Sequence, residues 1–288
     1  MTCIARGSRG ILRSVAKPVD HVGALLREWR AARRLSQLEL ALDAGVSSRH
    51  LSYVETGKAQ PSREMLAVLA DALEMPLRER NALLVAGGFT PEYAETPLTT
   101  PALAPVRRAI DLILEHQEPY PAFVINRRWD ILQANRAAAR IGNYLGVVSV
   151  HNNMIRQLCD PSDLRAHVTN WEEVAGDLIR HLHDEIAAHR SDAEMRALLD
   201  EALRYPGVPA RWRTRELGTI PPPLLTTEFL KNGERLRFFA TLTTFGTPRD
   251  VTLEELRIEC SFPIDDVTAE RCRALASADP DSAPRVGQ

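Results

Sequence analysis

The sequence of 288 residues lacks the features that mark several large classes of protein. No apolar run approaches the roughly 18 residues that a membrane-spanning helix needs, which excludes a transmembrane protein. Neither a zinc site nor a disulfide framework is indicated, because no C-x-x-C pair occurs among the four cysteines, Cys3, Cys159, Cys260 and Cys272. We therefore expect a protein of the reducing cytoplasm that has no membrane partner.

Catalytic signatures are also missing, since there is no G-x-S-x-G, no H-E-x-x-H and no glycine-rich phosphate loop. One set of metal-ligand types, His181, Glu185 and His189, recurs at helical spacing, with His183 nearby. The same pattern is typical of a solvated helix face. We expect no enzyme, no metal and no cofactor. An enzyme that acts on a small apolar substrate through unmarked residues stays open as an alternative.

An excess of charge of either sign is absent as well. Lys and Arg total 36 and Asp and Glu total 38, which gives a net charge of -2. Residues 1–96 carry 13 basic and 11 acidic side chains, whereas residues 97–288 carry 23 and 27. Bulk charge therefore indicates nucleic-acid binding by the first third only weakly, and the pattern of residues has to decide.

A change of composition divides the chain near residue 90. The segment TPEYAETPLTTPALAP carries four prolines, which is typical of a semi-rigid linker, and the length predicts two domains at roughly 150 residues each. We expect a basic flexible tail, a helical domain, a Pro-rich linker, a second domain and a flexible C-terminal tail, at residues 1–20, 21–90, 91–104, 105–268 and 269–288.

Capping signals predict five short helices in the first domain. Asp20 is placed to cap a helix that runs to Ala32, and Ser36 with Glu39 forms the S-x-x-E capping box of the next helix. The third, fourth and fifth helices open at Ser47, Ser62 and Pro76.

The second and third of these helices meet in a tight turn at Gly45. We expect Leu38, Ala41 and Leu42 to form the buried face of the second helix. Two helices joined in this way, the second with short polar side chains facing outward, form a helix-turn-helix. Its second helix fits the major groove of DNA, which is about 12 Å wide. The alternative is a small helical bundle whose polar outer face is merely solvated.

Residues 36–73, SQLELALDAGVSSRHLSYVETGKAQPSREMLAVLADAL, resemble the helix-turn-helix of XRE-type, phage-repressor-like transcription regulators. The resemblance covers residues 21–75. It depends on Ser36-Gln37, on Ala41 with Gly45, on Val54-Glu55-x-Gly57-Lys58 and on Pro61-Ser62.

This resemblance implies a double-stranded DNA operator as partner and roles for single residues. Ser36, Gln37 and Lys58 would contact backbone phosphates. The residues that would reach base edges from the third helix are Ser47, Ser48, Arg49 and Tyr53, and those at its rim are His50 and Ser52. The resemblance also implies an ion pair between Arg30 and Glu55. We expect a homodimer that binds a palindromic site.

The second domain shows strand and helix signals in a definite order. A hairpin is predicted over 120–135, followed by a helix that Asn135 caps. A helical region then runs over about 152–203, with one apolar stripe at Trp171, Val174, Leu178 and Leu182. Residues 224–230 and 236–245 flank Asn232-Gly233, a hairpin signal, and a further strand is predicted over 253–262. About five antiparallel strands with helices on one face make an α+β, PAS-like domain.

Three stretches of this domain resemble the ligand-binding domain of MmyB-like transcription regulators. They are PAFVINRRWD with NRAA after it, Asn170-Trp171, and FGTPRDVTLEELRIE, within about residues 105–265. The resemblance implies a PAS-like fold that takes up a small apolar effector, a fatty acid or related lipid.

A long acyl chain needs apolar walls and a polar anchor. We expect Arg156 to pair with a ligand carboxylate. The expected walls are Phe123, Ile125, Trp129, Ile131, Trp171, Phe238 and Phe239. The alternative is that these side chains are simply core. The sequence thus predicts a ligand-responsive transcription regulator, and a sensor that acts through a protein partner stays open beside it.

Overall fold

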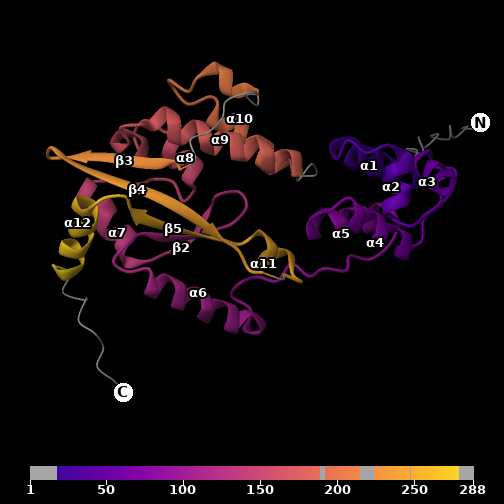
Figure 1. Ribbon diagram of the computed structural model, residues 1–288, viewed down its shortest axis with the longest axis horizontal. Coiled ribbons are helices and arrows are strands. Elements are labelled where there is room, and N and C mark those ends of the chain that lie inside the picture. Colours follow the sequence, from indigo (N-terminus) through magenta and orange to yellow (C-terminus); the bar gives the residue numbers. More distant parts are fainter. Residues whose placement is uncertain (1–17, 189–191, 215–223, 247, 279–288) are drawn as a thin grey trace, which may run out of the picture. The chain divides into compact units, whose positions relative to one another are not determined.

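The structure is a computed structural model that describes residues 18–188, 192–214, 224–246 and 248–278. The chain forms two compact units, Met1–Glu92 and Tyr93–Gln288, which are described one at a time (Figure 1). Residues 1–17 of the expected basic tail and residues 279–288 of the expected C-terminal tail lie outside the described part.

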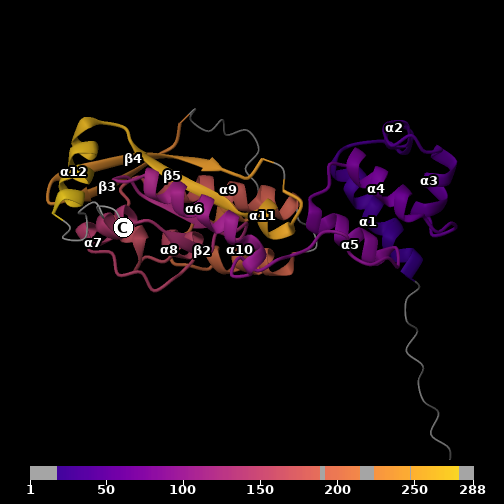
Figure 2. The same ribbon diagram turned by 90° about the horizontal axis from the view of Figure 1, so that it is seen from below.

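The first unit is a bundle of five short helices. They are α1 (Pro18–Ala32), α2 (Gln37–Asp43), α3 (Ser48–Glu55), α4 (Arg63–Ala72) and α5 (Leu77–Ala86). Figure 2 shows α1 in the middle of this unit, between α3 and α5, the two helices with which it makes most contact.

Most of the predicted helix boundaries are confirmed. The hydroxyls of Ser36, Ser47 and Ser62 each accept a hydrogen bond from the backbone three residues on, and Glu39 completes the capping box. The exception is α1, which begins at Pro18, so that Asp20 lies inside the helix and is not its N-cap.

The buried face of α2 differs from the prediction. Leu40 and Ala41 are buried, whereas Leu38 and Leu42 are 59% and 71% exposed. Residues 38 and 42 lie one turn apart on one face of the helix, so they are exposed together when the neighbouring face packs on the bundle. The sequence offered apolar residues on both faces, and the packing of α2 on the other helices selected one.

A close approach of α1 to α3 fixes the core of this unit. A Cβ atom added at Gly23 would lie 2.6 Å from the carbonyl oxygen of Val54 and 2.7 Å from that of Glu55. Only glycine allows the two backbones to come so near. Gly45, between α2 and α3, has φ +64°. This left-handed conformation ends α2 and makes the tight turn that leads into α3.

The second unit contains one antiparallel sheet with the strand order β2-β1-β5-β4-β3. Its strands are β1 (Ala122–Ile125), β2 (Ile131–Ala134), β3 (Thr226–Lys231), β4 (Glu234–Thr243) and β5 (Arg257–Pro263). Asn232 and Gly233 both have positive φ, as the predicted β3–β4 turn requires. The α+β, PAS-like class predicted for this domain is confirmed.

Helices cover both faces of this sheet, and not one face as predicted. The inner face carries α7 (Arg136–Leu145), α8 (Met154–Cys159), α9 (Trp171–Ala188), α10 (Ala193–Ala202) and α12 (Asp266–Ser277). On the opposite face, Ile110 and Leu114 of α6 (Ala104–His116) pack against Val124 and Ile258. Figure 1 shows α8, α9 and α10 above the strands and α6 below them.

Two further expectations for this unit are wrong. The strand predicted over 253–262 is replaced in its first part by helix α11 (Val251–Glu255), which Asp250 caps through the amide of Thr252. The C-terminal tail was expected from residue 269. Instead α12 continues to Ser277 and buries Cys272 against the inner cluster.

The proline-rich segment is attached to the second unit. Val251 donates a backbone hydrogen bond of 2.8 Å to the carbonyl of Ala94. The carboxylate of Asp250 accepts hydrogen bonds from the backbone amide of Thr96 at 3.2 Å and from its hydroxyl at 2.5 Å. Ala94 and Thr96, expected to be part of a linker, are therefore held by hydrogen bonds to the start of α11 and do not belong to a free connector.

Candidate functional site

The outward face of α3 presents a group of polar side chains that the fold leaves in solvent. Leu51 and Val54 of α3 face the core. The residues at the start of this helix, before Leu51, face outward. Arg49 and Tyr53 lie one turn apart on this face: Arg49 Nε donates to the Tyr53 hydroxyl at 3.1 Å, and its guanidinium lies 5.5 Å from the ring centroid. This contact orients both side chains and leaves other guanidinium N–H groups for a ligand.

The other predicted DNA-contacting residues fall into two sets. Ser47, Ser48, His50 and Lys58 are exposed and Ser52 is half-buried. Ser36 and Gln37 are engaged within the protein: the Ser36 hydroxyl accepts from the amide of Glu39, and Gln37 Nε2 donates to Glu55 Oε2 at 2.7 Å. A phosphate contact by Gln37 would have to share this amide with Glu55.

Beneath this face lies an ion pair. Arg30 donates from Nε and Nη2 to the two carboxylate oxygens of Glu55, at 2.7 and 2.9 Å, and from Nη1 to the carbonyl of Leu35 at 3.0 Å. The Glu55 side chain is fully buried, and its hydrogen bond raises the pKa of Arg30. The pair implied by the sequence resemblance is confirmed, and its role is to join α1 to α3.

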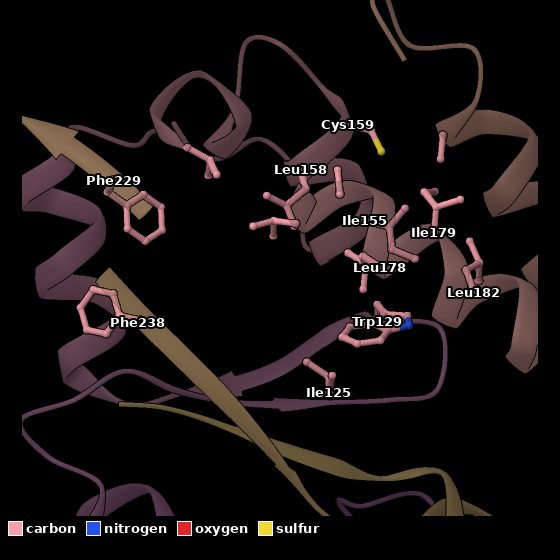
Figure 3. Close-up of a cluster of buried hydrophobic side chains, with 14 of the residues drawn as sticks. Ile125, Trp129, Ile155, Leu158, Cys159, Leu178, Ile179, Leu182, Phe229 and Phe238 are labelled. Carbon is pink, nitrogen blue, oxygen red and sulfur yellow. The ribbon is translucent and has the colours of Figure 1, made fainter. Parts of the chain in front are cut away.

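The second candidate site is the apolar cluster between the inner sheet face and the helices of the second unit. Figure 3 shows Trp129 and Ile125 on the sheet side of this cluster, across from Ile155, Leu158 and Leu178. Six of the predicted ligand walls belong to it: Ile125, Trp129 and Phe238 are buried, and the others, Phe123, Ile131 and Trp171, pack against these.

Phe239 does not belong to this cluster. Because side chains alternate along a strand, Phe238 and Phe239 face opposite sides of the sheet. Phe239 stacks on Phe262, with ring centroids 5.4 Å apart, and Phe262 packs on the α6 side. Phe239, predicted as a ligand wall, therefore lies on the opposite face of the sheet from the other six predicted walls.

Trp129 has two unusual properties. It occupies the β1–β2 turn with φ +66°, which is rare for a bulky residue. Its side chain is 5% exposed, and the indole Nε1 finds no hydrogen-bond acceptor in the described part of the chain. A buried indole N–H is usually paired, so this one is available to an acceptor atom of a bound molecule.

Arg156 is engaged as well. Its Nε and Nη2 donate to the carboxylate oxygens of Glu201 at 2.8 and 2.9 Å, a two-pronged pair that raises the pKa of Arg156. The structure therefore does not present Arg156 as a free carboxylate anchor. Sequence reasoning missed this pairing because Glu201 lies 45 residues away, on α10.

Models of two known protein families match the chain, one for each of the two candidate sites. Residues 21–83 match the model of a helix-turn-helix domain, and residues 106–275 match that of the MmyB-like transcription regulator ligand binding domain. The second match alone spans more than half of the chain. The chain belongs to the MmyB-like transcription regulators. It thus combines a DNA-binding helix-turn-helix with a ligand-binding domain.

Solved structures resemble parts of this MmyB-like regulator. The controller protein C.AhdI from Aeromonas hydrophila is 35% identical over 22% of this chain and 94% of its own, with a TM-score of 0.21. The clp gene regulator ClgR from Corynebacterium glutamicum is 26% identical over 36% and 96%, with a TM-score of 0.23. An RNA-binding light-oxygen-voltage receptor is 12% identical over 88% and 64%, with a TM-score of 0.24. TM-scores this low carry no argument about the fold, and no curated protein matches the chain.

The MmyB-like domain also contains a buried ion-pair network that the sequence did not reveal. Arg127, at the β1–β2 turn, lies 2.5 Å from the carboxylate of Asp192 at the start of α10 and 3.1 Å from that of Glu255 on α11. Arg127 and Asp192 are almost fully buried. The only signal in the sequence was a pair of arginines inside an apolar hairpin, which by itself marks a turn.

The histidines and the glutamate that the structure describes along α9 do not form a metal centre. In the described residues, no group of three or more His, Cys, Asp or Glu side chains is placed to hold a metal ion. His181 pairs with Asp177 at 3.3 Å, and Glu185 pairs with Arg257 on β5. His183 lies 2.9 Å from the carbonyl of Trp212, and His189 lies outside the described residues. In the described part of the chain, no helix is long and apolar enough to cross a membrane.

Proposed function

We propose that this regulator binds a specific double-stranded DNA operator through the outward face of α3, and that an apolar effector bound in the second unit changes its operator affinity. The observation that carries the DNA half is the exposed pair of Arg49 and Tyr53 at the N-terminal half of α3, above a helix junction fixed by Arg30 and Glu55. In a helix-turn-helix this part of the second helix contacts base edges, and an arginine there forms two hydrogen bonds with guanine.

Few basic side chains lie on this face, so affinity depends on placed contacts and on dimerisation. We propose a homodimer whose two copies of α3 enter the major groove one turn of DNA apart, about 34 Å, at a palindromic site. Specific contacts from both copies then compensate for the small positive charge of residues 1–96 in each copy.

The effector half of the proposal is supported by the apolar cluster with its unpaired indole. Aromatic and aliphatic walls with a few polar groups suit a fatty acid or related lipid. The Nε1 of Trp129 offers a hydrogen-bond donor inside these walls. A buried donor without an acceptor destabilises the fold by roughly 1–3 kcal/mol. An acceptor atom of a bound ligand would remove this free-energy cost.

A route for the response is supported by the contacts of α11. The Trp129 turn also carries Arg127, which pairs with Glu255 on α11. The start of α11 in turn holds Ala94 through the amide of Val251 and Thr96 through the carboxylate of Asp250. A change at the turn on effector binding would reach the segment that leads to the helix-turn-helix. Coupling of this kind typically amounts to about 1–3 kcal/mol.

The test uses the purified full chain. An operator is selected from a randomised DNA pool, and its affinity is measured for the apo protein and for the protein loaded with a medium-chain lipid. We expect enrichment of a palindrome and a change of about 5–150-fold in affinity on loading. Failure to enrich any sequence would overturn the DNA half, and equal affinities for apo and loaded protein would overturn the effector half.

A further inference from the structure

A carboxyl group lies on the inner face of the sheet, among the apolar side chains. Glu259 of β5 pairs directly with Phe123 of β1 and with Leu242 of β4. Residues that are directly opposite on neighbouring strands point to the same face of a sheet. Because Phe123 packs against the inner cluster, the side chain of Glu259 projects on the inner face as well.

Glu259 has no hydrogen-bond or ion-pair partner among the residues that the structure describes. Arg257, two positions earlier on the same strand and on the same face, is engaged with Glu185 of α9. Glu259 itself is half-buried, and removal from water raises its pKa to about 7. An acid in such a place weakens the fold at neutral pH, whereas a leucine or glutamine would not carry the penalty of an unpaired charge.

The sheet around Glu259 keeps accessible surface. Leu242, beside it on β4, is 44% exposed, and the neighbouring inner-face pair of Ala240 and Ser261 is also accessible. Apolar surface next to an unpaired carboxyl is what the polar end of an amphiphilic ligand requires, since the chain covers the apolar atoms while the head pairs with the carboxyl. The inner face thus has Trp129 as a donor and Glu259 as an acceptor.

We propose that Glu259 accepts a hydrogen bond from the polar end of the effector, and that this effector is a long-chain alcohol or primary amide and not an ionised fatty acid. The proposal rests on the apolar effector proposed above and narrows its chemistry. An alcohol or amide head donates to the carboxyl oxygen of Glu259. A ligand carboxylate has no proton to donate. At pH 8, where the carboxyl of Glu259 is largely ionised, it would also bring a second negative charge beside the first, which is unfavourable in a site of low dielectric constant.

The test compares ligands with equal chains and different heads. Displacement of the neutral dye Nile red from the full-length protein at pH 8 is measured with 1-dodecanol, dodecanamide and dodecanoate. We expect the alcohol and the amide to bind the wild-type protein at least about tenfold more tightly than the carboxylate. In Glu259→Gln the side chain loses its charge and gains an N–H donor, so the preference falls to within about threefold.

The matched control is Glu115→Gln, the same chemical change on the exposed side of α6. It should keep the wild-type preference, and thermal melting shows that each variant is folded. Tightest binding of dodecanoate to the wild type, or an unchanged preference in Glu259→Gln, would overturn the proposal while leaving an apolar effector in place. Binding of none of the three ligands would overturn the apolar effector itself, and this proposal with it.

Discussion

Arg30 and Glu55 face each other across the junction of α1 and α3, joined by two parallel hydrogen bonds of 2.7 and 2.9 Å. The same carboxylate accepts a third hydrogen bond from Gln37, at the first residue of α2. One buried glutamate therefore ties together the three helices that position the DNA-contacting face. The geometry of that face depends on a group that does not itself face DNA.

Removing the arginine should destabilise the first unit strongly. Arg30→Met leaves the fully buried carboxylate of Glu55 with Gln37 as its remaining side-chain partner, and breaking a buried pair in this way costs about 3–5 kcal/mol. Urea unfolding followed by circular dichroism measures the loss. The control is Arg63→Met, whose pair with Glu92 is more exposed and should contribute less than about 1 kcal/mol. Equal stability of the two variants would contradict the role given to Arg30.

Substitutions on α3 should separate base recognition from phosphate binding. Arg49→Ala should lower operator affinity by about 1–3 kcal/mol and relax the preference at one base position, with little change in stability because the side chain is exposed. Lys58→Ala, beyond the C-terminus of α3, should weaken binding to all sequences alike and reduce the slope of affinity against salt by about one. Binding to mutated operators over a range of salt concentrations distinguishes the two. A preference left intact in Arg49→Ala would place base recognition elsewhere.

Asp250 should transmit the effector signal. It caps α11 and also holds the amide and hydroxyl of Thr96, so Asp250→Ala releases the start of the second unit. We expect operator affinity of the apo protein to be kept and the change on effector binding to fall by most of its about 1–3 kcal/mol. Gel shift with and without lipid measures both.

The matched control for that variant is Asp265→Ala, which removes a comparable aspartate cap from α12 and also an ion pair with Arg237. It should leave the effector response intact. A response equally reduced in both variants would indicate general loosening of the second unit, and a full response in Asp250→Ala would exclude the proposed route.

Stability should fall as the pH rises from about 4.5 to about 7. Burial raises the pKa of Glu259 from 4.5 to about 7, so in this window the folded chain keeps a proton that the unfolded chain has released. Each pKa unit corresponds to about 1.4 kcal/mol, so the loss amounts to about 3 kcal/mol at most. Urea midpoints measured across this window should decline in the wild type and decline less in Glu259→Gln.

Asp160 acts outside this window. The Ser162 and His151 side chains hold the pKa of Asp160 down to about 2, so the stability contributed by Asp160 is present above about pH 4 and is lost below it. The two trends have opposite signs and separate in pH. A wild-type profile parallel to that of Glu259→Gln between pH 4.5 and 7 would show that Glu259 titrates normally.

The sequence by itself determined the features that depend on neighbouring residues. Ser36, Ser47 and Ser62 cap their helices, Asn232-Gly233 forms its hairpin turn, and the apolar stripe of α9 is buried where the periodicity predicted it. Caps, turns and periodic faces involve residues within a few positions of one another, so the chain carries them regardless of what packs around it.

Only the tertiary structure decided which partners distant residues have. Arg156, predicted as a ligand anchor, has Glu201 as its partner within the chain, and Gln37, predicted to contact a phosphate, has Glu55. The proline-rich segment attaches to Asp250, more than 150 residues later in the chain. An ionic or hydrogen-bonding side chain carries no sequence mark of its partner, because the partner is selected by burial, where an unpaired polar group is costly. Glu259 and the indole Nε1 of Trp129 are groups for which the described fold supplies no partner, which is why they point to a ligand.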